Sequence, residues 1–429
     1  MISAFKNICF GLLIIIPTCC GTDWTMFAND FQRTNRVNSS SIPENPIERC
    51  RFETSHRHEN FYTSPAIVNG TIYIGSFISN LYLFGALPPY EPSINRPFWW
   101  WGDGYVYSID AETCELNWEF NTGSWIEGSV AVEDGVVYVG NGDGFFFALD
   151  AETGEEIWEY NLPKENPLCD YAFSFIIFAS YCDTRNMNSS PLIYGDVIHF
   201  GSRSGHMNMM NKTSGEMIRR VEVNGDMHAA LALSNDQTRL YGATAMESNN
   251  VYAFDVITGD ILWQSTIPGL IYSLSPAVDS GDRVFWPSFD GKLAAFDGFT
   301  GDKLWEIDIG FTSRSSVSLG HDGIVYVAGF GSELIAVDPE NGQINWRAAL
   351  DSFSEGVTVG ENALVIGDYN GYLTKLETDG SILWQYCHTE NRCDREISRS
   401  SLTAIQGAPV LHNDKIYFGS YDGNVYVIE

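Results

Sequence analysis

The chain has 429 residues, of which 44% are hydrophobic and 40 are glycine, and its formal net charge at pH 7 is −31. Phosphate backbones are bound by clustered lysine and arginine, so this acidity excludes nucleic acid as an expected partner. We interpret it as a solubilising surface. The hydrophobic share is ample for a core, and the glycine content is typical of a turn-rich all-β protein.

Residues 1–21 have the pattern of a secretory signal peptide, because Lys6 precedes an apolar run at 8–16 and small residues follow Pro17. The apolar run is too short to span a bilayer, and no other segment is a candidate for a membrane span. A retained anchor or a lipid anchor is the weaker alternative. The sequence therefore predicts export to the extracellular space or the secretory-pathway lumen, or to the periplasm if the source is bacterial.

Six cysteines follow the predicted leader, and an even number in an exported chain suggests disulfides. Local pairs are the simplest assignment, because each brackets one insertion: Cys169 with Cys182, and Cys387 with Cys393. Cys50 and Cys114 are left over, and their pairing is open. Four Asn-x-Ser/Thr sequences predict N-glycosylation: Asn38, Asn69, Asn188 and Asn211.

Two short strands joined by a tight turn recur along the chain, most clearly in FFFALDAETGEEIWEY at 145–160. Alternating apolar residues indicate the first strand, the turn follows from Asp150 to Gly154, and Trp158 lies on the returning strand. Further copies occur at 105–120, 251–265, 293–307, 334–348 and 373–387, with a degenerate copy at 207–221 and a half copy at 424–429. A second hairpin precedes each copy.

Each unit of about 40 residues predicts one antiparallel four-stranded blade, so residues 22–429 are expected to form a single eight-bladed β-propeller. The last unit, 408–429, has only three strands. We therefore expect the N-terminal segment 23–36 to supply its outer strand and to close the ring. This places seven tryptophans on outer strands as packing residues between blades: Trp24, Trp118, Trp158, Trp263, Trp305, Trp346 and Trp384. The unit at 187–221 has Arg219-Arg220 instead.

The repeat V-Y-A-L-D-A-x-T-G-x-x-x-W and the opening D-W-x-x-F-x-x-D-x-x-R-T resemble the PQQ-type propellers of the quinoprotein alcohol dehydrogenase-like superfamily, over nearly all of residues 22–429. The resemblance implies an eight-bladed ring. It leaves the function open, because this fold includes quinone-dependent dehydrogenases and non-catalytic scaffolds. One such scaffold is the propeller lipoprotein that helps assemble outer-membrane β-barrels.

Four long segments fall on connections that an antiparallel blade places on one face: 37–62, 77–103, 162–187 and 386–406. We expect them to form a partial lid over the half of this face that holds the functional site. The second segment contains Trp99, Trp100 and Trp101. These rings either clamp an apolar or carbohydrate-like ligand or, as we favour, pack together as a small satellite core.

Polar and aromatic residues also lie on the connections that lead toward the central axis. We expect them around one funnel: Trp125, Glu127, Asp226, His228, Tyr272, Arg314 and Glu355. Carboxylates with an arginine and a histidine could coordinate Ca²⁺ or anchor an acidic cofactor such as PQQ. The alternative, which we favour, is that these residues hydrate the channel mouth and cap the strand ends.

In the alcohol dehydrogenases of the superfamily, a disulfide between adjacent cysteines stacks over the quinone. The only adjacent cysteines here, Cys19 and Cys20, lie at the leader boundary, and the chain has no Cys-x-x-Cys-His haem motif. We therefore predict a monomeric, non-catalytic protein that acts by binding or as a scaffold. Its partner is expected to be a protein or a glycan on the loop-bearing face, and we assign it no cofactor or metal. The alternative is a PQQ- and Ca²⁺-dependent alcohol or sugar dehydrogenase, whose catalytic residues would be unknown.

Overall fold

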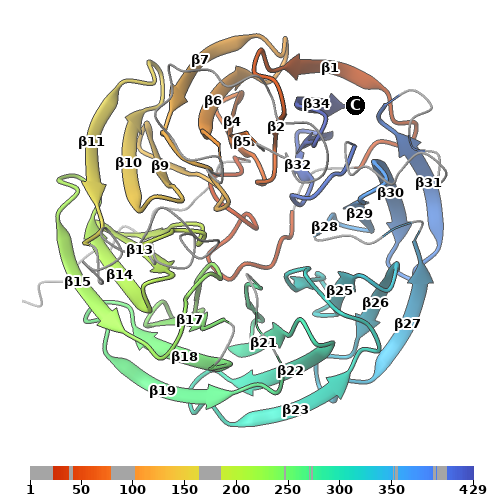
Figure 1. The fold of residues 1–429 in the computed structure, drawn as a ribbon. Coiled ribbons are helices and arrows are strands. Elements are labelled where there is room, and N and C mark those ends of the chain that lie inside the picture. The colour runs from red at the N-terminus through yellow and green to blue at the C-terminus, as the bar shows by residue number, and fades with distance from the viewer. Residues whose placement is uncertain are drawn as a thin grey trace, which may run out of the picture.

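The computed structural model describes residues 23–37, 42–78, 102–163, 185–245, 248–269, 271, 274–350, 352, 356–389, 393 and 403–429. Within these ranges the chain forms eight four-stranded antiparallel sheets around a central axis (Figure 1). The protein is therefore the eight-bladed β-propeller that the repeat predicts. In each blade the first strand lies nearest the axis and the last strand lies at the rim.

The first four blades take their strands in chain order; only in blade 1 is the order interrupted, by the short strand β5 (Phe77–Ile78), which pairs with β2 (Glu59–Asn60). Blade 1 contains β3 (Ala66–Val68), β4 (Thr71–Gly75), β6 (Tyr105–Asp110) and β7 (Leu116–Asn121). Blade 2 contains β8 (Ala131–Glu133), β9 (Val136–Gly140), β10 (Phe145–Asp150) and β11 (Glu156–Asn161). Blade 3 contains β12 (Leu192–Tyr194), β13 (Val197–Ser202), β14 (His206–Asn211) and β15 (Met217–Glu222). Blade 4 contains β16 (Ala232–Leu233), β17 (Arg239–Ala243), β18 (Asn250–Asp255) and β19 (Ile261–Thr266).

The remaining blades repeat this order, except that the last takes its outer strand from the N-terminal part of the chain. Blade 5 contains β20 (Ala277–Val278), β21 (Arg283–Pro287), β22 (Lys292–Asp297) and β23 (Lys303–Asp308). Blade 6 contains β24 (Ser318–Leu319), β25 (Val325–Gly329), β26 (Glu333–Val337) and β27 (Ile344–Ala349). Blade 7 contains β28 (Val357–Val359), β29 (Ala363–Gly367), β30 (Tyr372–Glu377) and β31 (Ile382–Cys387). Blade 8 contains β32 (Val410–His412), β33 (Lys415–Gly419), β34 (Asn424–Ile428) and β1 (Glu48–Glu53).

The core is divided into clusters that lie between neighbouring blades. Phe285 and Leu293 of blade 5, for example, pack in one cluster with Val327 and Ile335 of blade 6. The middle strands are therefore buried on both faces and read as near-continuous apolar runs, whereas the outer strands alternate between exposed and half-buried residues. This packing explains why the middle strands, such as Phe145–Asp150, are more hydrophobic than the outer strands, such as Glu156–Asn161.

The repeated turn between the third and fourth strands is held by an aspartate. In blade 2 the Asp150 carboxylate accepts hydrogen bonds from the main-chain N–H groups of Glu152 and Thr153, at 3.0 and 2.8 Å. Gly154 then takes a φ of 74°, which a residue with a side chain rarely adopts. The Asp-x-x-Thr-Gly pattern of the sequence is thus a local turn motif, repeated around the ring.

Neighbouring blades are joined by one repeated contact from the outer strand to the next turn. Six indole N–H groups donate to main-chain carbonyls at 2.9–3.2 Å: Trp118 to Ala151, Trp158 to Lys212, Trp263 to Gly298, Trp305 to Pro339, Trp346 to Thr378 and Trp384 to Pro43. Blade 3 uses Arg219 in this place, and its guanidinium bonds to the Thr258 carbonyl and pairs with Asp260 at 2.8 Å. Tryptophan is favoured here because it offers a large apolar ring with one donor at its edge.

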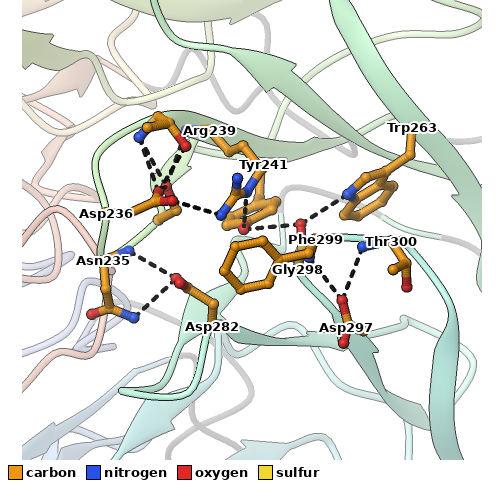
Figure 2. Close-up of polar contacts among 12 residues, drawn as sticks. Asn235, Asp236, Arg239, Tyr241, Trp263, Asp282, Asp297, Gly298, Phe299 and Thr300 are labelled. Carbon is orange, nitrogen blue, oxygen red and sulfur yellow. Dashed lines mark hydrogen bonds and ion pairs between the residues drawn. The ribbon is translucent and has the colours of Figure 1, made fainter.

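Figure 2 shows this joint between blades 4 and 5. The Gly298 carbonyl accepts from the Trp263 indole at 2.9 Å and from the Tyr241 hydroxyl at 3.1 Å. The neighbouring turn glycine, Gly301, lies against the Trp263 ring so closely that a Cβ there would come within 2.6 Å of it. Glycine is therefore required both by its φ of 76° and by the contact with the ring.

The N-terminal strand closes the ring as predicted, but the residues that form it differ from the prediction. β1 pairs antiparallel with β34, with Arg51 opposite Tyr426, so residues 48–53 supply the outer strand of blade 8, and not 23–36. Cys50 occupies the register position that tryptophan holds in other blades, just after the bulge in the outer strand. Part of the segment 37–62, expected to be an inserted loop, is therefore a strand.

Trp24 is consequently not an outer-strand residue, and its predicted place was wrong. It is 1% exposed, and its main chain exchanges two hydrogen bonds with Ile67 of the inner strand β3. The assignment failed because the opening Asp-Trp resembles the end of a repeat, whereas the following residues do not form a strand.

Residues 23–37, which we call the axial segment, instead cross the centre of the ring (Figure 1). Main-chain carbonyls of the segment accept hydrogen bonds from inner-strand N–H groups of five further blades: Val132, Leu233, Val278, Leu319 and Val359. Inner strands of two or three residues leave such groups unpaired toward the axis, and burying an unpaired N–H costs free energy. The axial segment removes that cost by pairing with them.

Two disulfides are present in the described part of the chain. Cys387 and Cys393 form the predicted local pair, with 5.8 Å between their Cα atoms. Cys50 and Cys114, whose pairing the sequence left open, are joined to each other with a Cα–Cα distance of 5.9 Å. Cys169 and Cys182 lie outside the described residues, as do most of the insertions at 77–103, 162–187 and 386–406.

Candidate functional site

A cavity of about 330 Å³ lies at the axis, on the face where the chain enters the inner strands. In six blades, the residue four positions before the inner strand lines this cavity. We call this set the mouth ring: Tyr62, Glu127, Asn188, His228, Arg314 and Gln406. One position in the repeat therefore supplies a different side chain from each blade to a common space.

Below the mouth ring, serines form a second layer, two positions before the inner strand. We call it the serine collar: Ser64, Ser129, Ser190, Ser275 and Ser316. Each hydroxyl except that of Ser64 accepts a hydrogen bond from the main-chain N–H of the equivalent residue in the preceding blade, at 2.9–3.2 Å. The collar links neighbouring blades around the cavity and keeps its lower wall polar.

The axial segment forms the floor of the cavity through Phe27 and Asn35. The Asn35 amide nitrogen lies 3.4 Å from the Ser318 hydroxyl and also bonds to the Val357 carbonyl. Nearby, the Arg33 guanidinium is buried and bonds to the main-chain carbonyl of Leu231 at 2.8 Å. These contacts fix the segment in place, so the floor is part of the folded ring.

One wall of the cavity carries a connected set of polar groups from blades 2, 3 and 4. The Asn188 amide donates to the Glu127 carboxylate, and its nitrogen lies 3.2 Å from Nδ1 of His228. On the other side of the imidazole, Nε2 lies 3.6 Å from the Asp226 carboxylate, which also pairs with Arg203 at 3.4 Å. The wall is thus a chain of alternating acidic and basic groups.

These surroundings shift the pKa values of the two carboxyl groups in opposite directions. Desolvation raises the pKa of Glu127 above its ordinary value, although the nearby charges of His228, Arg203 and Arg314 oppose the shift. Desolvation acts in the same sense on Asp226, but the hydrogen bond and charge of His228, with a contribution from Arg203, lower its pKa overall. Glu127 is therefore the weaker acid of the two.

A second wall is aromatic and comes from blades 1 and 8. The Tyr62, Phe77 and Tyr421 rings lie within 6.1–6.4 Å of one another, centroid to centroid, with the Phe77 ring edge-on to both tyrosines. The Tyr421 hydroxyl bonds to the side-chain carbonyl of Gln406 in the mouth ring. Such rings offer flat apolar surface and polar edges to a ligand.

Trp125 completes the lining between the two walls. Its ring lies across the turn at Gly142, where a Cβ would come within 2.1 Å of the indole. A side chain at position 142 would therefore displace Trp125 from the cavity wall.

Of the funnel residues predicted from the sequence, Trp125, Glu127, His228 and Arg314 line the cavity, and Asp226 supports it from behind. Five others lie outside the described residues: Tyr272, Glu355, Trp99, Trp100 and Trp101. Sequence reasoning missed several lining residues: Phe27, Asn35, Tyr62, Phe77, Asn188, Gln406 and Tyr421. The missed residues of the mouth ring could have been found by taking the residue four positions before each predicted inner strand.

Asn188 was instead predicted as a glycosylation site, and a glycan at this position stays a prediction. The nitrogen that a glycan would occupy donates to Glu127 within the cavity wall. Asn69 is exposed on a turn, so a glycan at this site remains a prediction, whereas Asn38 lies outside the described residues. The Asn211 side-chain oxygen holds its own turn by accepting from the N–H groups of Thr213 and Ser214.

The donor groups at the cavity do not fit PQQ held by Ca²⁺. The described lining offers one carboxylate, Glu127, which Asn188 already engages, and one guanidinium, that of Arg314. Ca²⁺ takes about six to eight oxygen ligands, several of them carboxylate, and an acidic quinone needs several cationic partners. In the part of the chain that the structure describes, no group of three or more His, Cys, Asp and Glu side chains is placed to hold a metal ion.

The family model for the outer membrane protein assembly factor BamB matches residues 102–172, 184–320 and 314–429, which is most of the propeller. The chain belongs to this family. BamB of Burkholderia pseudomallei (strain K96243) is 26% identical over 336 residues, which cover 76% of this chain and 79% of that protein. BamB of Moranella endobia (strain PCIT) is 27% identical over 256 residues, 56% of this chain and 61% of that protein. The match to the latter thus spans less than two thirds of the relative.

BamB-family membership and the structural comparison agree on the fold. A europium-containing methanol dehydrogenase superimposes with a TM-score of 0.71 at 12% identity, covering 95% of this chain and 98% of that one. At this identity the likeness concerns the propeller fold alone. No helix in the described residues is long and apolar enough to cross a membrane.

Proposed function

We propose that this BamB-family chain is an exported, monomeric, non-catalytic propeller that binds a ligand or partner at its axial mouth and serves as a scaffold. The observation that carries the proposal is the mutual engagement of the polar wall. Glu127, Asn188, His228 and Asp226 are held by one another and by neighbouring cations. A wall whose charges are already balanced is suited to binding rather than to reaction.

The geometry around His228 supports a non-catalytic role. A serine nucleophile needs a base within hydrogen-bond reach and a third group to orient that base. Here one imidazole nitrogen faces Asn188 and the other faces Asp226. Neither nitrogen therefore faces a collar hydroxyl, and four of these hydroxyls bond instead to main-chain N–H groups.

The names of the relatives support a partner that is a protein, since both are described as factors in the assembly of outer membrane proteins. We place the partner on the face that carries the axial mouth, where the long segments 77–103, 162–187 and 386–406 are predicted to lie. The signal-like residues 1–21 support export.

The test is a calorimetric titration of the purified exported protein with PQQ, with and without Ca²⁺, together with a dye-linked dehydrogenase assay on alcohols and sugars. We expect no saturable heat and no turnover, because the lining has one carboxylate and one guanidinium among the described residues. Saturable, Ca²⁺-dependent binding of PQQ together with turnover would contradict the scaffold function and would show a quinoprotein dehydrogenase.

A second arm tests the proposed face directly. A photo-crosslinking residue is placed at Gln406 in the mouth ring or, as the matched control, at Ile257, which is 73% exposed. We expect discrete protein adducts from position 406 alone in the native compartment. Adducts from position 257 alone would move the partner away from the axial mouth.

A further inference from the structure

The axial cavity has two walls of different chemistry that face a common space. The Tyr62, Phe77 and Tyr421 rings form the apolar wall, and Glu127, Asn188 and His228 contribute to the polar one. A ligand that fits both walls has one face of C–H groups to lie on the rings and an edge of hydrogen-bonding groups. Flat aromatic ligands offer the first feature without necessarily offering the second.

The hydrogen-bonding groups around the cavity include both acceptors and donors that are not yet used. The side-chain oxygens of Asn35 and Asn188 are buried, and neither has a hydrogen-bond partner among the described residues. The hydroxyls of Ser129, Ser190 and Ser275 each accept an N–H bond and make no donor contact within the described chain. The ligand must therefore both donate and accept, and the hydroxyl group is the simple neutral group that does both.

The charge balance of the polar wall selects against charged ligands. The Glu127 carboxylate lies near His228, Arg203 and Arg314, and Asp226 is paired with Arg203 and His228. Placing an added anion or cation there would leave one charge uncompensated in a partly buried site, which costs free energy. A neutral ligand avoids this cost.

We propose that the axial cavity binds a single neutral polyhydroxylated ring, a monosaccharide unit, between the aromatic wall and the Glu127–Asn188–His228 wall. The cavity of about 330 Å³ is near the lower end of small-molecule sites, about 300–1,000 Å³, which favours one ring over an oligosaccharide. The proposal rests on the proposed binding function and specifies its ligand class. The sugar is either free in solution or the terminal unit of a glycan.

The test is saturation-transfer NMR, followed by calorimetry, on the full exported chain. The probes are D-glucose, D-galactose, D-mannose and N-acetyl-D-glucosamine, each also as its methyl α- and β-glycosides. We expect at least one sugar to bind with a Kd of about 1 mM or tighter. Binding of a methyl glycoside indicates a terminal glycan unit, whereas binding of the reducing sugar alone indicates a free monosaccharide.

Paired variants at one position separate stacking from hydrogen bonding. Tyr421→Ala removes a ring of the aromatic wall and is expected to weaken binding about tenfold or more, whereas Tyr421→Phe keeps the ring and should retain most of the affinity. Asn188→Ala should also weaken binding. Ile257→Ser, far from the cavity lining, is the control, and thermal melting confirms that each variant is folded.

The outcomes distinguish this inference from the function on which it rests. No binding by any sugar, or binding that Tyr421→Ala and Asn188→Ala leave unchanged, overturns the sugar site. If a photo-crosslinking residue at position 406 still captures a protein partner, the scaffold function is supported even though the sugar site is not. Ca²⁺-dependent PQQ binding with turnover overturns both.

Discussion

At the scale of single residues, Glu127 and Asp226 show how one wall treats two carboxyl groups differently. Both are desolvated, but Asp226 contacts His228 and Arg203 directly, whereas Glu127 receives an uncharged amide from Asn188. The hydrogen bonds and charges of His228 and Arg203 overcome desolvation at Asp226, whereas at Glu127 desolvation outweighs the charges of His228, Arg203 and Arg314. The pKa of Glu127 is therefore raised and that of Asp226 lowered.

Replacement of Glu127 by glutamine should change the pH dependence of stability. Because its pKa is raised from 4.5 in the folded chain, the folded state holds this proton more tightly than the unfolded state, and stability is lost as pH rises through the folded pKa. Glu127→Gln removes that loss. We expect the melting temperature of the variant, relative to the natural chain, to increase between pH 4.5 and neutral pH.

The matched control is Glu152→Gln, at an exposed turn position. Its melting temperature relative to the natural chain should change little across the same pH range. A Glu127→Gln difference that falls as pH rises would show that Glu127 is stabilised in its ionised form, contrary to the structure.

At the scale of elements, the joint between blades combines a tryptophan, a carbonyl and a glycine. Gly301 at the blade 4–5 joint and Gly323 in a blade 6 turn both have positive φ, 76° and 83°. Of the two, only Gly301 lies against another residue, the Trp263 ring. The two glycines therefore separate the cost of the backbone conformation from the cost of the contact.

Alanine at these two positions should destabilise the protein by different amounts. Gly323→Ala is expected to lower the free energy of unfolding by about 1–2 kcal/mol, the cost of a left-handed backbone with a side chain. Gly301→Ala should lose a further 1–3 kcal/mol, roughly, because its Cβ would displace the Trp263 ring. Urea titrations measure both. Equal losses of unfolding free energy in the two variants would mean that the Trp263 ring can move away from the new Cβ without destabilising the protein.

Elements that are held by side-chain contacts could be predicted from the sequence, whereas an element held by main-chain hydrogen bonds could not. The blades and their joints follow from the repeated Asp-x-x-Thr-Gly turn and from tryptophans such as Trp118 and Trp305, because these side chains make the contacts themselves. The axial segment bonds to inner strands chiefly through its carbonyls, which every sequence possesses. No residue pattern distinguished it from an outer strand.

In the candidate site, too, some of the lining residues could be predicted from the sequence and others could not. Glu127, His228 and Arg314 could be placed at the axis because they precede inner strands of the repeat. Phe77 and Tyr421 follow second strands, and whether such residues reach the axis depends on the tilt of the blade, which the sequence does not state. The aromatic wall was therefore missed.

At the scale of the whole molecule, the joint between blade 8 and blade 1 differs chemically from the others. Cys50 takes the tryptophan position, and Cys114 takes the turn position that Gly154 holds in blade 2, with a positive φ of 58° against 74° for the glycine. The disulfide therefore replaces the tryptophan–glycine contact at the one joint where the N-terminal strand completes the ring. The chain already runs from β1 into blade 1, so this bond fastens the strand that completes blade 8 to its neighbour, while the pairing of β1 with β34 closes the ring without a covalent bond.

Removal of this disulfide should destabilise the protein more than removal of the local one. Cys50→Ser with Cys114→Ser opens a link across 64 residues and is expected to cost about 2–4 kcal/mol. Cys387→Ser with Cys393→Ser, which opens a link across 6 residues, should cost less. Denaturant titrations under non-reducing conditions measure the difference.

A third variant tests whether the joints are equivalent. Cys50→Trp with Cys114→Gly places at blade 8 the pair used elsewhere, and it should recover part of the stability lost in the double serine variant. If it is no more stable than that variant, the disulfide site is not a substituted tryptophan joint.

The axial segment also has a consequence for the order of assembly. Residues 23–37 are made before any blade, yet their hydrogen-bond partners extend along the chain from Ile67 to Val359. The segment therefore has no complete set of partners until blade 7 has been synthesised. A segment made early must therefore wait for partners from most of the ring, and only the pairing of β1 with β34 in blade 8 depends on residues made later still.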